Sequence, residues 1–150
     1  MKNMPLPQIS IFNRQRKLPI DRAIFEEFAR QALPLCAGKR GTGLTTLPQI
    51  DVVFISDRKM IELHRRFMQI DGPTDVITFQ HGEIFISVET ALRQAKTERT
   101  SLAYELRLYL VHGLLHLQGF DDQTKADQQR MAALQERIIA SLLSPGRFAL

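Results

Sequence analysis

Apolar positions recur along part of the chain with the periods of β-strands. Residues 8–12 alternate between apolar and polar side chains, as expected of a half-buried strand. Residues 50–56 form an almost continuous apolar, β-branched run, which is typical of a strand buried on both faces. Two further strands are predicted over residues 75–79 and 83–88, and the short loop between them, which contains Gly82, favours an antiparallel hairpin.

Five other segments show the helical period, with apolar residues recurring every three or four positions. Asp57 is expected to cap the second helix, and Thr124 with Asp127 forms a capping box before the last. In the first helix the apolar positions with helical spacing are Ile20, Ile24, Phe28 and Leu35. The predicted helices cover residues 21–34, 57–67, 89–96, 102–118 and 125–143. Four strands and five helices predict an α+β fold, with a small mixed sheet and the helix over 102–118 at its centre.

Length and composition narrow the class of protein. A chain of 150 residues is expected to form a single domain over residues 1–150, and a 44% hydrophobic share is ample for its core. The single cysteine, Cys36, excludes an internal disulfide and a cysteine-based zinc cage, and it fits a reducing compartment. We identify no signal peptide near the start, and no apolar run approaches the ~18 residues of a membrane span. No membrane partner is therefore expected.

The balance of charges is compatible with a polyanionic partner. The chain has 20 basic and 16 acidic residues, which gives a net charge of +4, and such an excess suits nucleic acid binding. Arg65 and Arg66, near the end of the second predicted helix, are candidates for phosphate contacts. Solvated surface charge is the alternative, because Glu62 lies four residues before Arg66, at the spacing of a helix-surface ion pair.

The helix predicted over residues 102–118 carries the candidate chemistry. It is apolar nearly all round and so belongs in the interior, where His112 and His116 are costly unless their ring nitrogens find partners. Four residues apart on one face, their rings can both reach a single ion at the ~2.0–2.1 Å of zinc–nitrogen bonds. Gly119 then favours a helix end and a turn back, which would add Asp122 as a third ligand. This spacing predicts a metal site.

The same segment is also compatible with a structural role and with other chemistries. Histidines at this spacing can be hydrogen-bonded core residues, and Asp121 and Asp122 can lie in a solvated loop or cap the next helix. A zinc peptidase has its general base directly after the first histidine, where this chain has Gly113, so the sequence argues against a peptidase. Gly113 instead leaves room for a closely packed strand or for a bulky substrate.

The segment His112–Asp122, HGLLHLQGFDD, resembles the signature of the YbeY family of metal-dependent endoribonucleases, also called rRNA maturation factors. Residues 53–56, 60–67, 72–79 and 82–87 are similar to family segments, so the resemblance is strong over residues 50–122 and looser elsewhere. It implies an α+β fold, a zinc ion, and cleavage of single-stranded rRNA in late small-subunit maturation and ribosome quality control. It also implies a cytoplasmic setting, with the small ribosomal subunit and a ribosome-associated GTPase as partners.

The chain departs from the family pattern at two positions. Asp122 stands where the family usually has a third histidine; aspartate is a competent zinc ligand, although its charge should weaken the Lewis acidity of the ion. Its harder oxygen also makes Mn²⁺ or Mg²⁺ more acceptable than an all-imidazole site would. Met68 stands where the family commonly has an arginine for the RNA phosphate, and Arg65 or Arg66 is the candidate replacement.

The sequence is therefore compatible with two functions. The leading hypothesis is a metal-dependent endoribonuclease with His112, His116 and Asp122 as metal ligands and zinc as the expected ion. The alternative is a non-catalytic RNA- or ribosome-binding assembly factor in which the altered site is structural or empty. Cleavage of single-stranded rRNA that is lost in His112→Ala or Asp122→Ala would distinguish the first from the second.

Overall fold

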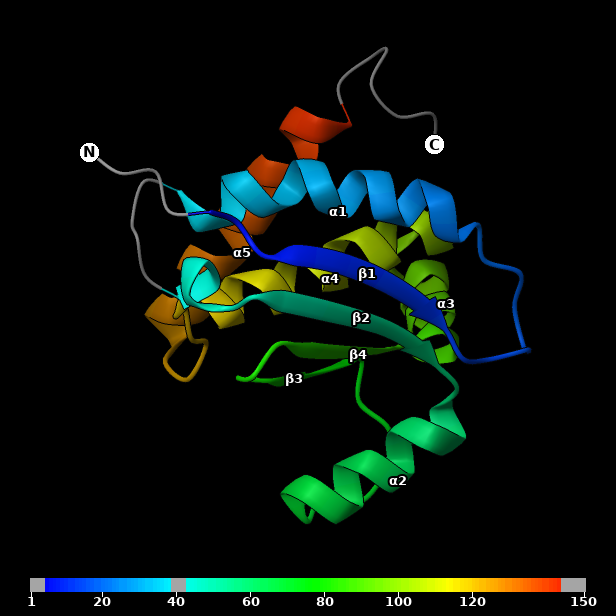
Figure 1. Cartoon of the computed structure of the whole chain (residues 1–150). Helices are drawn as coiled ribbons and strands as arrows, with labels where there is room; N and C mark the ends of the chain where they lie inside the picture. The colour runs from blue at the N-terminus through cyan, green and yellow to red at the C-terminus, as the bar shows by residue number, and fades with distance from the viewer. Residues whose placement is uncertain (1–4, 39–42, 144–150) are drawn as a thin grey trace.

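Four strands form one mixed sheet in the order β1-β2-β4-β3 (Figure 1). The structure, a computed structural model, describes residues 5–38 and 43–143. β1 pairs in parallel with β2, and β2 pairs in parallel with β4. β3 lies at the edge and pairs antiparallel with β4, which confirms the predicted hairpin. The strands are β1 (Gln8–Asn13), β2 (Gln49–Ile55), β3 (Val76–Phe79) and β4 (Glu83–Ser87).

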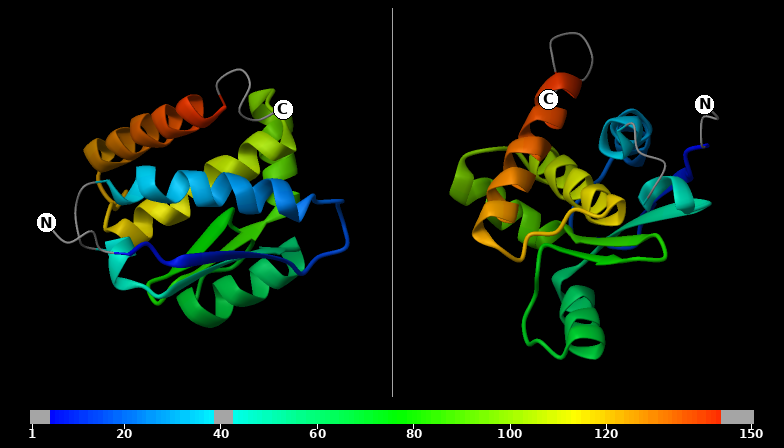
Figure 2. Two further views of the ribbon diagram at one scale, coloured as in Figure 1. Left: turned by 45° about the horizontal axis from the view of Figure 1, so that its top comes forward. Right: turned by 90° about the vertical axis from the view of Figure 1, so that its left-hand side faces the viewer.

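Helices cover the two faces of this sheet unequally. One face carries four helices, α1, α3, α4 and α5, whereas α2 lies alone on the other (Figures 1 and 2). The α+β prediction is confirmed. No helix in the ranges 5–38 and 43–143 is long and apolar enough to cross a membrane. The helices are α1 (Arg22–Ala37), α2 (Asp57–Met68), α3 (Val88–Glu98), α4 (Leu102–Gln118), α5 (Lys125–Leu142) and the 3-10 helix η1 (Gly43–Thr46).

Helix α4 lies at the centre of the larger core, as its all-round apolar pattern predicts. Its residues Leu106, Leu110 and Leu114 are fully buried, together with strand residues such as Ile84. Gly113 brings this helix close to the sheet, because a Cβ atom there would lie 2.7 Å from Cγ2 of Ile84. Of the two expected roles for Gly113, the structure shows the close packing of a strand.

Helix α1 differs from its prediction in length and in its buried face. It continues through Pro34 to Ala37, where Gly38 N–H donates to the Pro34 carbonyl at 3.1 Å. Ile24 and Leu35 are exposed, although their spacing had indicated the core. Phe28 is buried as predicted. The other buried residues of the helix form a neighbouring stripe that also has helical spacing: Phe25, Ala29, Ala32, Leu33 and Cys36.

The cap of α2 is Ser56 and not Asp57. The Ser56 hydroxyl accepts from Lys59 N–H at 3.2 Å. Asp57 is the first residue of the helix, and its carboxylate accepts hydrogen bonds from Ser87 and Thr90 at the start of α3. Both residue types favour the cap position, so tertiary partners decided between them. Thr124, by contrast, caps α5 as predicted, and Ser101 caps α4.

Candidate metal centre

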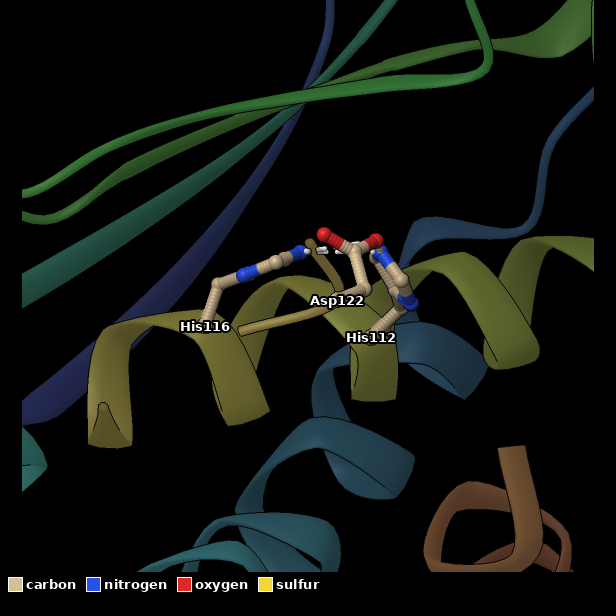
Figure 3. A group of neighbouring side chains, drawn as sticks. All are labelled: His112, His116 and Asp122. Carbon is tan, nitrogen blue, oxygen red and sulfur yellow. Dashed lines mark hydrogen bonds and ion pairs between the residues drawn. The ribbon is translucent and has the colours of Figure 1, made fainter. Parts of the chain in front are cut away.

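The end of helix α4 and the turn after it bring the three predicted ligands together. Gly119 ends the helix in a left-handed conformation with φ +117°, and its N–H donates to the carbonyls of Leu115 and His116. The chain then turns back over the helix, so that Asp122 faces the two rings (Figure 3). The ligand atoms of His112, His116 and Asp122 all lie within 4.8 Å of one another.

The distances between these atoms suit a small cation. His112 Nε2 and His116 Nε2 are 3.0 Å apart, and each lies 3.6 Å from Asp122 Oδ2. A tetrahedral zinc ion with bonds of about 2.0–2.1 Å holds its ligand atoms about 3.3–3.4 Å apart. The observed separations bracket that spacing, so the group can hold a metal ion with little movement.

The outer nitrogens of both rings are already engaged. His116 Nδ1 lies 3.0 Å from the carbonyl of Phe120, which can only accept, so this nitrogen carries the proton. His112 Nδ1 lies 2.7 Å from Gln135 Oε1 on α5, and the same tautomer follows. Two Nε2 lone pairs and a carboxylate therefore face one another, an arrangement that repels until a positive charge lies between them.

The surroundings of His116 favour its neutral, metal-binding form. Burial lowers the pKa of His116 below its ordinary value, and the neighbouring His112 lowers it further, against the opposing effect of Asp122. Both histidine side chains are 23% exposed and Asp122 is 43% exposed. The group is thus fixed within the protein on one side and open to a ligand on the other.

A cavity of about 340 Å³ opens beside the three ligands. Its opposite wall is the edge of the sheet, formed by β3 and the residues that precede it, and Met68 at the end of α2 closes one side. A larger hollow of about 610 Å³ lies between the ends of α1 and α4 and the start of α5, and it includes none of the three ligands. The smaller cavity is therefore the candidate active site. Its lining consists of Met68, Thr74, Asp75, Val76, Ile77, Thr78, Gln80, His112, His116 and Asp122.

The structure places Arg65 and Arg66 outside this cavity. They line a separate hollow of about 380 Å³ on α2, together with Arg58 and Glu62. Arg65 Nε pairs with Asp71 at 3.2 Å, and the Arg66 guanidinium lies 5.3 Å from the centre of the Phe67 ring. Glu62 pairs with Lys59. Met68 lines the candidate active-site cavity, which the two arginines do not reach.

Two supporting residues escaped the sequence analysis. Gln135 orients His112. Its position could have been recognised from the sequence, because it lies four residues after Met131 and three before Ile138 and so falls on the buried stripe of α5. Gln118 braces the end of α4, since its amide donates to Ala37 O at 3.0 Å and accepts from Leu44 N–H at 2.9 Å. No local pattern marks Gln118, because its partners lie more than 70 residues away.

Comparisons with known proteins identify the family. The family model described as endoribonuclease YbeY matches residues 10–143. The endoribonuclease YbeY of Moorella thermoacetica is 32% identical over 154 residues, covering 90% of this chain and 97% of that protein. The YbeY of Salinispora tropica is 36% identical over 121 residues, covering 66% of this chain and 77% of that protein.

A solved structure supports the fold. The solution structure of a Thermotoga maritima protein matches with a TM-score of 0.61 and 22% identity, covering 93% of this chain and 99% of that chain. This likeness concerns the fold alone. The family model and the curated relatives together show that the chain belongs to the YbeY endoribonuclease family.

Proposed function

We propose that this protein is a metal-dependent endoribonuclease that cleaves single-stranded RNA in late small-subunit rRNA maturation and in ribosome quality control. The observation that carries the proposal is the convergence of His112, His116 and Asp122 on an open cavity in a chain of an endoribonuclease family. Residues 1–150 act as one domain in the cytoplasm, with the small ribosomal subunit and a ribosome-associated GTPase as partners.

Zinc is the proposed ion, with Mn²⁺ or Mg²⁺ as the alternatives that a carboxylate ligand favours. When bound, such an ion polarises a phosphodiester oxygen and neutralises the charge that develops during cleavage. Phe120 and Gln135 hold the two rings in the tautomer that directs Nε2 inward. Asp122 adds a negative charge, so we expect weaker Lewis acidity than three imidazoles would give.

The RNA strand is proposed to run from the cavity onto α2. Met68 lies at the cavity wall, and Arg65 and Arg66 precede it on the last turns of this helix. Both guanidinium groups lie at the surface, where they can contact phosphates flanking the cleaved bond. Because these contacts are outside the cavity, they hold the backbone and do not touch the reacting atoms.

The test combines metal analysis with cleavage of an unstructured RNA oligonucleotide. The purified protein is expected to bind one metal ion per chain and to cleave the RNA internally. His112→Ala and Asp122→Ala should each lose both properties, because two ligands hold the ion far less tightly. His81→Ala is the matched control, since this exposed histidine pairs with Glu83 outside the cavity.

Cleavage that persists unchanged in both ligand variants would overturn the metal-dependent mechanism. RNA binding without cleavage in the metal-loaded wild type would instead favour the assembly-factor function. The variant Asp122→His, which restores the ligand usual in the family, is expected to raise the metal affinity or the rate.

A further inference from the structure

The wall of the cavity opposite the metal ligands is an unpaired strand edge. β3 is at the end of the sheet order and pairs only with β4 among the described strands. Its residues Val76, Ile77 and Thr78 line the same cavity as His112 and His116. Main-chain donors and acceptors at this edge therefore face the space in which the substrate would lie.

The register of the hairpin shows which main-chain groups are free. Ser87 N–H donates to Asp75 O at 3.0 Å, so the hydrogen-bonded pairs of the ladder fall on Asp75, Ile77 and Phe79. The alternate residues, Val76 and Thr78, consequently direct both N–H and C=O away from β4, and both residues line the cavity.

One of these two outward N–H groups is already occupied. Val76 N–H donates to Asp75 Oδ1 at 2.8 Å. The groups left free on these two residues are Val76 C=O, Thr78 N–H and Thr78 C=O, and the first two form an acceptor and a donor on neighbouring outward residues. An added peptide strand would need a longer series of free groups, whereas a single base edge needs only one donor and one acceptor.

We propose that Thr78 N–H and Val76 C=O pair with the Watson–Crick edge of one unpaired nucleotide, next to the phosphodiester bond that is cleaved. This inference rests on the proposed endoribonuclease function. Every nucleobase places a donor beside an acceptor on this edge, and in a duplex the partner base occupies both. The strand edge would therefore admit only an unpaired nucleotide, which gives a physical basis for a preference for single-stranded RNA.

A proline substitution tests the role of Thr78 N–H directly. Thr78→Pro removes an N–H that takes no part in the ladder, so the edge strand should tolerate it. We expect adenosine 5′-monophosphate to bind roughly three- to tenfold more weakly, because one hydrogen bond is lost. We also expect a smaller ratio of single-strand to duplex cleavage. Thr78→Val controls for the loss of the hydroxyl.

Amide exchange supplies a readout that needs no substitution. In the metal-loaded wild type, adenosine 5′-monophosphate should shift the Thr78 amide resonance and slow its hydrogen exchange, while the Val76 amide changes little. Circular dichroism and metal content verify that Thr78→Pro is folded.

The outcomes separate this inference from the proposed function. If the wild type cleaves RNA but the Thr78 amide does not respond to the nucleotide, or Thr78→Pro keeps the strand preference, the base-edge contact is wrong and the nuclease function stands. If the Thr78 amide is protected only as protein concentration rises, the edge pairs with a second copy of the chain, which also overturns the contact. If the metal-loaded wild type cleaves no RNA, both proposals fall together.

Discussion

The hydrophobic cores on the two faces of the sheet differ in size. Among the residues that the structure describes, the face under α4 belongs to a core of 27 buried residues, whereas the α2 face has a cluster of five: Val53, Ile55, Met60, Leu63 and Ile77. Partly buried Phe12, Phe79 and Phe85 flank the smaller cluster, and Phe67 and Ile70 at the end of α2 are each 50% exposed. The densely packed face carries the candidate metal ligands, and the sparsely covered face carries the surface arginines.

This difference separates two physical requirements. Metal ligands must be held in a fixed geometry, which a buried helix with packed neighbours supplies. Contacts to a flexible RNA backbone depend on charge at the surface and tolerate movement.

Truncation of one leucine on each face should give unequal losses of stability. Leu110→Ala, in the middle of α4, is expected to lower the free energy of unfolding by about 4 kcal/mol, because its surroundings cannot collapse into the cavity. Leu63→Ala, on α2, should cost about 2 kcal/mol, since fewer neighbours surround it. Urea denaturation measures both, and equal losses would contradict the distinction between the faces.

A larger side chain at Gly113 should overpack the contact between α4 and β4. Gly113→Ala places a methyl group 2.7 Å from Cγ2 of buried Ile84, and we expect a loss of about 1–3 kcal/mol and weaker metal binding at the adjacent His112. The double variant Gly113→Ala/Ile84→Ala should lose less than the sum of the single variants. Additive losses in the double-mutant cycle would show that the contact between Gly113 and Ile84 does not set the distance between α4 and β4.

Removal of the support of His112 should weaken metal binding and leave the fold intact. Gln135→Leu eliminates the acceptor for Nδ1, and a roughly 10- to 100-fold loss of zinc affinity is expected. Competition with a chelator measures the affinity, and Gln129→Leu, on an exposed position of α5, is the control. An unchanged affinity would mean that ring orientation is fixed without Gln135.

The attachment of α2 to α3 should depend on pH. Burial raises the pKa of Asp57, but hydrogen bonds from Arg93, Ser87 and Thr90 outweigh it, so the pKa lies below its ordinary value. A lowered pKa in the folded state gives stability that is present above the ordinary aspartate pKa of about 3.9 and is lost as the pH falls through the folded value.

Below about pH 4, the free energy of unfolding should therefore fall less steeply in Asp57→Asn than in the wild type. Thr90→Val, which removes one of the hydrogen bonds, should give an intermediate result. Denaturation at a series of pH values measures the slope, and a slope unaffected by Asp57→Asn would exclude this carboxylate as its source.

The smallest effects on stability are expected at the arginines of α2. Arg66→Ala should change the free energy of unfolding by less than about 0.5 kcal/mol. It should nevertheless make the binding of single-stranded RNA less sensitive to salt. The slope of the logarithm of the binding constant against the logarithm of the salt concentration should become shallower by about 0.7, which corresponds to the loss of one phosphate contact. Arg30→Ala, an exposed arginine on α1 that pairs with Glu27, is the control. Identical slopes for all three proteins would remove Arg66 from the RNA-binding surface.

Much of the fold could be predicted because its signals are local. The hairpin from β3 to β4, the all-apolar helix α4 and the caps Ser101 and Thr124 each depend on residues close in sequence. Where two local patterns were equally good, prediction failed: Ile24 and Leu35 share helical spacing with the stripe that is buried, and Ser56 and Asp57 are both suitable caps.

The sequence by itself determined the candidate metal ligands, because a four-residue helical interval and a glycine turn fix His112, His116 and Asp122 within one short segment. Only the tertiary structure decided what surrounds them. Gln135 reaches His112 from another helix, β3 supplies the opposite wall, and Arg65 and Arg66 lie outside the cavity. These relations join distant parts of the chain through packing, for which no periodicity or local spacing gives a signal.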